Sequence, residues 1–197
     1  MKSTFLLAVL VFLFAFSSVV ACAAREQVRD TTGKLVRAAV NYYIIPASPN
    51  IGGVSPNATD QPCPPDVFSV DGNLGMAVAF WPVSVKKDIV RVNTDLNIDF
   101  QDYLGCSRSS LWRLKDYDYL TQQWFVSTGG FLGNPGRDSI GNWFKIEKYE
   151  DDYKLSYCPN VCPNCSHPCM DIGIYEDKYG KRLALSSVPY KVRFQII

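Results

Sequence analysis

Four cysteines are crowded near the C-terminus, and their spacing could serve two different chemistries. They follow the pattern Cys158-x3-Cys162-x2-Cys165-x3-Cys169. In a reducing compartment, thiolates at such spacings can hold zinc or an iron–sulfur cluster. In an oxidising compartment the same residues form disulfides. The compartment therefore decides the chemistry, and the start of the chain indicates which one it is.

Residues 1–23 have the three parts of a secretory signal peptide. Lys2 is basic, an apolar run extends from Phe5 to Phe16, and Ala21-Cys22-Ala23 supplies the small residues that signal peptidase selects. The alternative is a membrane anchor, but the run is short for a span and no stop-transfer pattern follows it. We therefore expect a cleaved signal peptide and one secreted domain at 24–197.

Loss of the signal peptide changes the number of cysteines from seven to six. Cys22 leaves with it, and Cys63 and Cys106 remain beside the four C-terminal cysteines. An even number in a secreted chain indicates disulfides, and six cysteines allow fifteen pairings. We therefore expect disulfides in place of a metal site, and no cofactor.

The usual constellations of nucleophilic catalysis are absent from this sequence. His167 is the single histidine, the six cysteines are expected to be paired, and no Gly-x-Ser-x-Gly sequence occurs. Asp and Glu are plentiful, but no pair of carboxylates stands out. We therefore expect that the protein is not an enzyme. We interpret His167 as an exposed spacer, with metal binding or pH sensing as the alternative.

The charge pattern argues against nucleic acid as a partner. The formal net charge is +1, and no basic run is longer than Lys86-Lys87 or Lys181-Arg182. Nucleic acid requires a concentrated basic face. The aromatic content of 13% fits the packing of strands and core. No second apolar segment follows the signal peptide, so no membrane association is expected.

Short apolar runs alternate with clusters of Gly, Pro, Asn and Asp along the domain, which is typical of strands and turns. The expected strands are 41–45, 76–80, 90–92, 96–100, 123–126, 143–146, 153–157, 172–175, 183–185 and 190–196. Regularly spaced short strands indicate an all-β sandwich or barrel and do not decide between them. No helix longer than two turns is expected. Internal similarity is too weak to predict a threefold repeat.

Both ends of the domain resemble one plant family. The N-terminal pattern is Val28-x-Asp30-x-x-Gly33 followed by Val40-x-Tyr42-Tyr43-x-Ile45. The C-terminal pattern comprises Trp143-Phe-Lys-Ile146, Tyr153-Lys-Leu-Ser-Tyr-Cys158, the four cysteines, Asp171-Ile-Gly173 and Lys181-Arg-Leu-Ala-Leu-Ser186. The chain resembles the Kunitz soybean-trypsin-inhibitor family, in particular its miraculin-like branch. The resemblance implies a twelve-stranded, pseudo-threefold β-trefoil with disulfides Cys63–Cys106, Cys158–Cys169 and Cys162–Cys165.

The resemblance also implies protease inhibition through an exposed, substrate-like loop. The residue before the scissile bond fills the specificity pocket, which is acidic in trypsin-like enzymes and takes Lys or Arg. Leu96-x-Ile98-x-Phe100 resembles the strand after this loop, and counting back ten residues gives Lys86. The loop is therefore expected at residues 82–89, with its centre formed by Val85, Lys86, Lys87 and Asp88. The Lys86–Lys87 bond is the expected scissile bond, and Lys87–Asp88 and Arg91–Val92 are alternatives.

Two departures from the family pattern concern this loop. Lys87 stands where members carry a small aliphatic residue, and Arg37-Ala38-Ala39 lacks the Asn whose side chain braces the loop from inside. A less braced loop loses more entropy on binding and is cleaved more readily. In the alternative function, the two lysines are ordinary solvated charges on a trefoil that inhibits a cysteine protease, or binds a carbohydrate or another protein.

Two further expectations concern modification and assembly. Asn57-Ala58-Thr59 is an N-glycosylation sequon in a turn-rich segment, so a glycan on Asn57 is expected. In the miraculin-like branch that the chain resembles, subunits can be linked through an additional cysteine near positions 149–151. This chain has none there, so we expect a monomer. The resemblance also implies a role in plant defence, and with its signal peptide the protein is expected in the extracellular space (apoplast) or the vacuole.

Overall fold

The computed structural model describes residues 25–48, 51–56, 66–84, 88–101 and 109–197, and the structural statements below concern these residues. The predicted signal peptide, the Asn57 sequon and the Cys63–Cys106 disulfide lie outside them. Residues 85–87, the centre of the predicted inhibitory loop, also lie outside them.

The described residues form twelve short strands and one 3-10 helix, η1 (Arg137–Asn142). The strands are β1 (Asn41–Pro46), β2 (Gly53–Ser55), β3 (Phe68–Val70), β4 (Val78–Pro82), β5 (Leu96–Phe100), β6 (Arg113–Leu114), β7 (Val126–Ser127), β8 (Lys145–Tyr149), β9 (Asp152–Tyr157), β10 (Met170–Asp177), β11 (Gly180–Ser186) and β12 (Lys191–Ile196). No helix in this part of the chain is long and apolar enough to cross a membrane.

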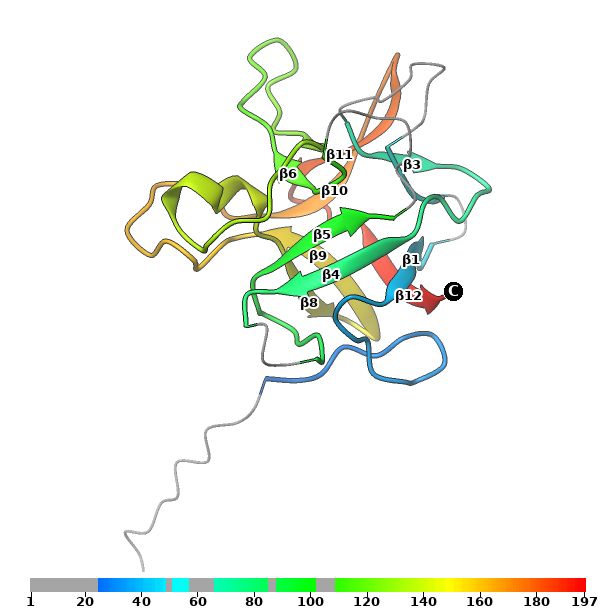
Figure 1. Cartoon of the computed structure of the whole chain (residues 1–197). Coiled ribbons are helices and arrows are strands. Elements are labelled where there is room, and N and C mark those ends of the chain that lie inside the picture. Colours follow the sequence, from blue (N-terminus) through cyan, green and yellow to red (C-terminus); the bar gives the residue numbers. More distant parts are fainter. Residues whose placement is uncertain (1–24, 49–50, 57–65, 85–87, 102–108) are drawn as a thin grey trace, which may run out of the picture.

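Six of these strands close into a barrel. Strand β1 pairs with β12 and with β4, β4 pairs with β5, and β9 pairs with both β8 and β12. Leu96 and Phe144 complete the ring, because each backbone N–H donates to the carbonyl of the other at 2.9 Å. The barrel of β1, β4, β5, β8, β9 and β12 lies at the centre of Figure 1.

The other six strands are three hairpins, β2–β3, β6–β7 and β10–β11, that join one another at one end of the barrel. Arg182 of β11 pairs with Phe68 of β3. Single bridges connect Phe125 to Ala184 and Asp66 to Ser127. Each third of the chain therefore contributes two barrel strands and one hairpin. This arrangement is the β-trefoil that the resemblance implied, and its threefold pattern was not evident in the sequence.

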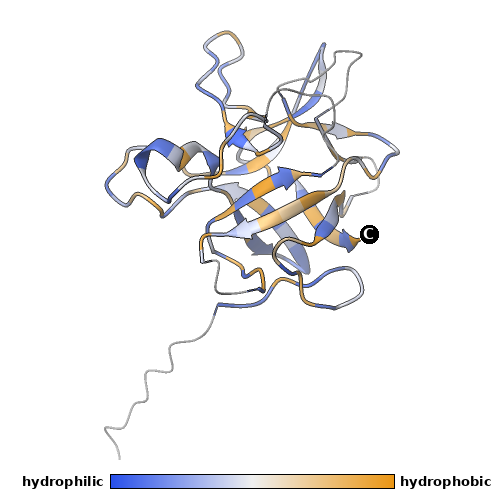
Figure 2. Ribbon diagram, in the orientation of Figure 1, coloured by the Kyte–Doolittle hydropathy of each residue, from blue (hydrophilic) through white to orange (hydrophobic). Residues whose placement is uncertain are grey.

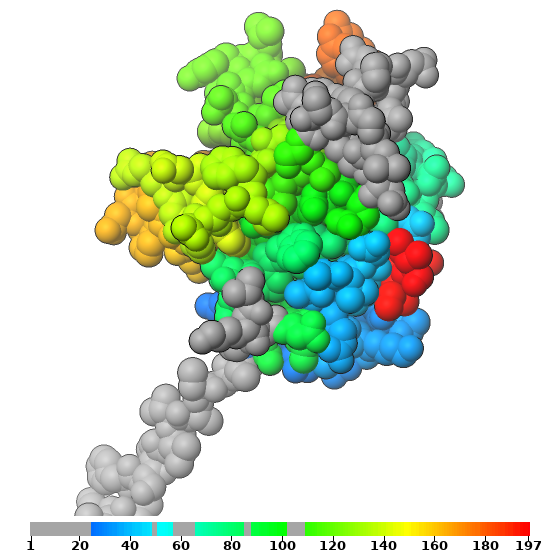
Figure 3. Space-filling model, in the orientation of Figure 1, coloured from blue at the N-terminus to red at the C-terminus, as the bar shows by residue number. Residues whose placement is uncertain are grey.

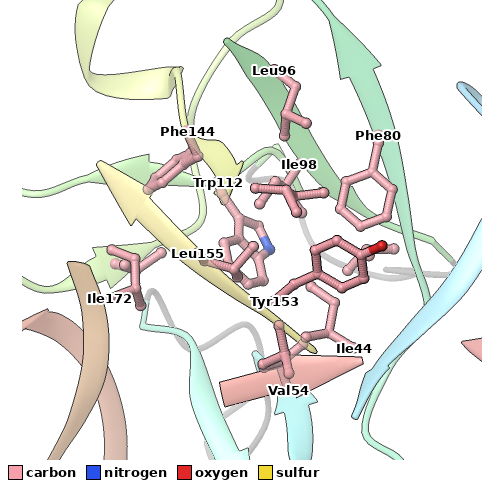
Figure 4. Packing of buried hydrophobic residues seen from close by; sticks show 14 of the residues in the cluster. Ile44, Val54, Phe80, Leu96, Ile98, Trp112, Phe144, Tyr153, Leu155 and Ile172 are labelled. Atoms are coloured by element: carbon pink, nitrogen blue, oxygen red, sulfur yellow. The ribbon is translucent and has the colours of Figure 1, made fainter. Parts of the chain in front are cut away.

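The core fills the barrel with alternate residues of its strands. On β1, Tyr42 and Ile44 are buried while Tyr43 and Ile45 are partly exposed. This period of two is expected of a strand with one face on a core, and polar and apolar residues adjoin along the barrel strands in Figure 2. The side chains meet from different thirds of the chain, as Figure 4 shows for Phe80, Ile98 and Tyr153.

Some strand boundaries differ from the predictions. Residues 90–92 form no regular strand. Instead Arg91 makes a single bridge to Gln27, and the neighbouring Ile89 makes one to Arg37. The strands β2, β3 and β6 were not predicted, because each is only two or three residues long and lacks a run long enough to show a period.

Candidate inhibitory site

The predicted inhibitory segment lies in the connection between β4 and β5. These two strands are antiparallel, with Val78 opposite Phe100 and Pro82 opposite Leu96. Pairing continues one step past the strand ends, because the Val83 N–H donates to the Asp95 carbonyl at 2.9 Å. The entry to the connection is therefore fixed to the barrel, and the exposed Ser84 follows directly.

The exit from the connection is held between two parts of the N-terminal segment. The Val90 N–H donates to the Val36 carbonyl at 2.9 Å, and the Val90 carbonyl accepts the Val28 N–H at 3.0 Å. The Val92 N–H donates to the Glu26 carbonyl at 2.9 Å. Val90 is fully buried. Residues 88–92 are thus paired on both edges, which restrains the backbone on this side of the segment.

Of the four residues predicted to form the centre of the loop, Asp88 is the one that the structure describes, and it contacts the stretch that lacks an Asn. The Ala38 N–H donates to the Asp88 carbonyl at 2.8 Å, and the Arg37 guanidinium forms an ion pair with the Asp88 carboxylate. The backbone N–H of Arg37 is itself held by the hydroxyl of Tyr42, at 3.0 Å. This stretch therefore supports the base of the loop through its backbone and one exposed charge.

Of the alternative scissile bonds, Arg91–Val92 is disfavoured by its surroundings. Val92 is only 6% exposed, and its N–H is already bonded to Glu26. The backbone here would have to break its hydrogen bond to Glu26 before the Arg91–Val92 peptide bond could enter a protease cleft. The choice of the scissile bond among residues 85–88 stays a prediction.

Asp95 connects the entry of the segment to the cysteine-rich region, a role that no local pattern of residues predicted. Its carboxylate is 3.7 Å from the Lys145 ammonium nitrogen and accepts the backbone N–H of Asn160 at 3.0 Å. Both charged side chains are buried. Burial raises the pKa of Asp95, and Lys145 and the Asn160 N–H oppose this rise.

Two predicted disulfides are present in the C-terminal region. Cys158 is bonded to Cys169 and Cys162 to Cys165, with Cα atoms 4.3 and 5.4 Å apart. The pairing removes these four cysteines as metal ligands, and no cluster of metal-binding side chains occurs elsewhere in the described ranges. His167 is half-buried, not exposed as expected, because its ring packs against Tyr157.

Comparison with known proteins assigns the chain to a family. Residues 28–196 match the Kunitz legume family model, described as "Trypsin and protease inhibitor". The chain belongs to the Kunitz family of trypsin and protease inhibitors. The match spans nearly all of the trefoil. It includes the residues on both sides of the β4–β5 connection, which we call its entry stem (82–84) and its exit stem (88–92). The protein is therefore a Kunitz-type protease inhibitor and not an enzyme, and its partners are proteases.

Individual Kunitz proteins support the same assignment. The chain is 42% identical over 177 residues to Kunitz trypsin inhibitor 5 of Arabidopsis thaliana, covering 88% of this chain and 87% of that protein. It is also 42% identical to miraculin of Synsepalum dulcificum, over 87% and 83% of the two chains. Among solved structures, the Kunitz-type cysteine protease inhibitor PCPI-3 from potato superposes with a TM-score of 0.79 at 34% identity, covering 88% of this chain and 98% of that one.

Proposed function

We propose that this Kunitz inhibitor blocks trypsin-like serine proteases through residues 84–88, with Lys86 in the specificity pocket. The observation that carries the proposal is the pairing of both stems: Val83 is bonded to Asp95, and Asp88 is bonded to Ala38 and Arg37. A short segment between two fixed points has few conformations to lose. Its entropy cost on docking into a protease cleft is correspondingly small.

The choice of a trypsin-like target rests on the residues themselves and on the names of relatives. Lys86 and Lys87 offer the long cationic side chain that an acidic specificity pocket binds. The similar Arabidopsis thaliana protein is named a trypsin inhibitor. Lys86 is assigned to the pocket because of its distance in sequence from Leu96.

The test is a titration of trypsin with the oxidised protein, residues 24–197, compared with Lys86→Ala, Lys87→Ala and the control Lys178→Ala. Lys178 is exposed in the turn of the β10–β11 hairpin, and in Figure 1 this hairpin lies at the opposite end of the molecule from the β4–β5 connection. We expect stoichiometric inhibition by the wild type and by the control, and its loss in Lys86→Ala. A folded wild type that does not inhibit trypsin, or loss in Lys87→Ala alone, would reject the role of Lys86.

Cysteine protease inhibition is the second candidate, because the similar potato structure is named a Kunitz-type cysteine protease inhibitor. Papain added to the same titration separates the two functions. Inhibition of papain that survives Lys86→Ala, without inhibition of trypsin, would place the activity on another surface of the trefoil.

We further propose that the protein is secreted as a monomer, with cleavage after Ala23 or Ala24, and that it acts in plant defence. Mass spectrometry of the protein from the apoplast or the vacuole would give the mature N-terminus and the compartment. The same spectrum would report whether Asn57 carries a glycan.

A further inference from the structure

Five cations gather on the surface that holds the exit stem of the inhibitory segment. We call this surface the basic face and define it by Arg25, Arg29, Lys34, Arg37 and Arg91. The first four are exposed and Arg91 is half-buried. They come from two separate parts of the chain, which explains why no basic run is visible in the sequence. In Figure 3 the N-terminal part lies at the lower end of the molecule.

The contacts that bring these cations together are specific. The Arg91 Nη1 donates to the carbonyl of Arg25 at 2.7 Å, and the Arg29 Nη1 donates to the carbonyl of Gly33 at 2.7 Å. Within the described ranges, Arg37 is the one member with an ion-pair partner, Asp88. The other four positive charges are not neutralised by a carboxylate in direct contact.

The carboxylates within the segments 25–37 and 88–94 are few, although Arg29 also lines a pocket with Asp151 and Asp152, which Lys148 and Arg193 share. Asp88 is engaged with Arg37. Asp30 is buried, and its Oδ1 accepts the N–H groups of Thr32 and Lys34. Glu26 is exposed. The segments 25–37 and 88–94 together hold five cations and three carboxylates.

The rest of the molecule carries the opposite charge. Without Lys2 of the predicted signal peptide, the chain has 19 Lys and Arg and 19 Asp and Glu, so 14 cations and 16 carboxylates lie outside the basic face. In sequence, Lys86 and Lys87 directly precede the segment 88–94. Counting them with the basic face makes the difference in charge between this face and the rest of the chain larger. Asp116 is exposed in the β6–β7 hairpin and Glu176 in the β10–β11 hairpin. In Figure 1 these two hairpins lie at the end of the molecule opposite to the N-terminal segment.

We propose that the basic face is an interaction surface for the rim of the protease cleft, and that the preferred target is a trypsin-like protease with an acidic rim. The inference rests on the proposed function. A protease that takes residues 84–88 must cover the neighbouring surface, because such interfaces bury about 800 Å² of each partner. Charges at the rim of an interface act mainly on the association rate and on its salt dependence.

The experiment measures association and dissociation rates with an anionic and a cationic trypsin, from low to high salt. The test variant is Arg29→Glu/Lys34→Glu, and the matched control is Arg137→Glu/Lys178→Glu, which makes the same change in charge at exposed residues away from the stems. At low salt the wild type should associate about tenfold faster with the anionic enzyme. This preference should disappear in the test variant and at high salt, and it should persist in the control.

A third variant, Glu26→Lys, should increase the association rate with the anionic trypsin. Equal association rates with the two enzymes, or equal behaviour of the test and control variants, would overturn the proposed role of the basic face. The proposed inhibition of trypsin-like proteases would still stand. Failure of the folded wild type to inhibit either trypsin would overturn both the inference and the proposed function.

Discussion

The Arg37 guanidinium pairs with the Asp88 carboxylate at the exit from the proposed inhibitory segment. The two side chains are 55% and 64% exposed, so solvent screens their attraction and the pair contributes little to global stability. Its position nevertheless gives it an effect on the exit stem, because the Ala38 N–H is bonded to the same residue. The pair therefore supplies a contact at the base of the segment, in the stretch where the sequence lacks the expected Asn.

We expect Arg37→Ala to weaken trypsin inhibition about two- to fivefold, the range that an exposed ion pair can supply. The same change should speed cleavage of the segment by trypsin. Arg37→Lys should retain part of the effect, and high salt should remove the difference between wild type and Arg37→Ala. Inhibition constants and cleavage rates that are unchanged by Arg37→Ala would show that the backbone pairing alone supports the stem.

The Asp95–Lys145 pair should show a large effect on stability. Both side chains are less than a tenth exposed, so Lys145→Met leaves a buried carboxylate without its cation. We expect a loss of about 3 kcal/mol in the free energy of unfolding at pH 7, measured with urea. The double variant Lys145→Met/Asp95→Asn should recover part of this loss.

The pH dependence of this pair has a definite sign. The pKa of Asp95 is raised above 3.8 in the folded state, so folding favours the protonated form. The contribution of this group to stability is greatest below pH 3.8 and falls as the pH rises through the folded pKa. Lys145 lowers the pKa of Asp95, and Lys145→Met removes this effect. The loss in the free energy of unfolding that this variant causes should therefore be smaller at pH 4 than at pH 7. An equal deficit at both pH values would contradict this account.

Tyr157 should limit stability in alkaline solution. Burial raises its pKa to about 12, and its hydroxyl donates to the Ile140 carbonyl at 3.3 Å. Because the unfolded chain ionises this tyrosine near its ordinary pKa of 10.0, stability should fall as the pH rises above 10. Ultraviolet titration of tyrosinate in wild type and Tyr157→Phe measures this late ionisation. Its persistence in Tyr157→Phe would assign it to another residue such as Tyr190, whose pKa burial also raises.

The two C-terminal disulfides should differ in their contribution to stability. Cys158–Cys169 has a sequence separation of 11 and Cys162–Cys165 a separation of 3. On the chain-entropy model, replacing each pair by alanine costs about 3 and about 2 kcal/mol respectively. Thermal or urea unfolding of the two double variants tests this order. A larger loss for Cys162–Cys165 would indicate that this disulfide also supports folded contacts.

Local patterns predicted the strands that are five or more residues long and in which apolar and polar residues alternate clearly. β1, β5 and β9 appear close to their predicted bounds because one face of each packs on the core. β2 and β6 have only three and two residues. They are strands because partners from elsewhere in the chain pair with them, and such pairing leaves no local period.

Within the site, the resemblance paired the C-terminal cysteines correctly. The inhibitory segment that it implied falls between β4 and β5 and stays a prediction. The contacts of Asp95 with Lys145 and Asn160 were not predictable, since they join residues from distant parts of the chain. The absence of an Asn near Ala38 suggested weak support for the loop, whereas Arg37 and the backbone supply contacts at its base.

The sequence by itself determined the β class and, through its motifs, the Kunitz family, because these depend on residue types at short spacings. The tertiary structure decided the closure of the barrel through Leu96 and Phe144, the pairing of Arg37 with Asp88, and the gathering of cations on the basic face. Each of these joins residues that are far apart in the chain. Such proximity is set by the packing of the whole barrel, and no local pattern of residues encodes it.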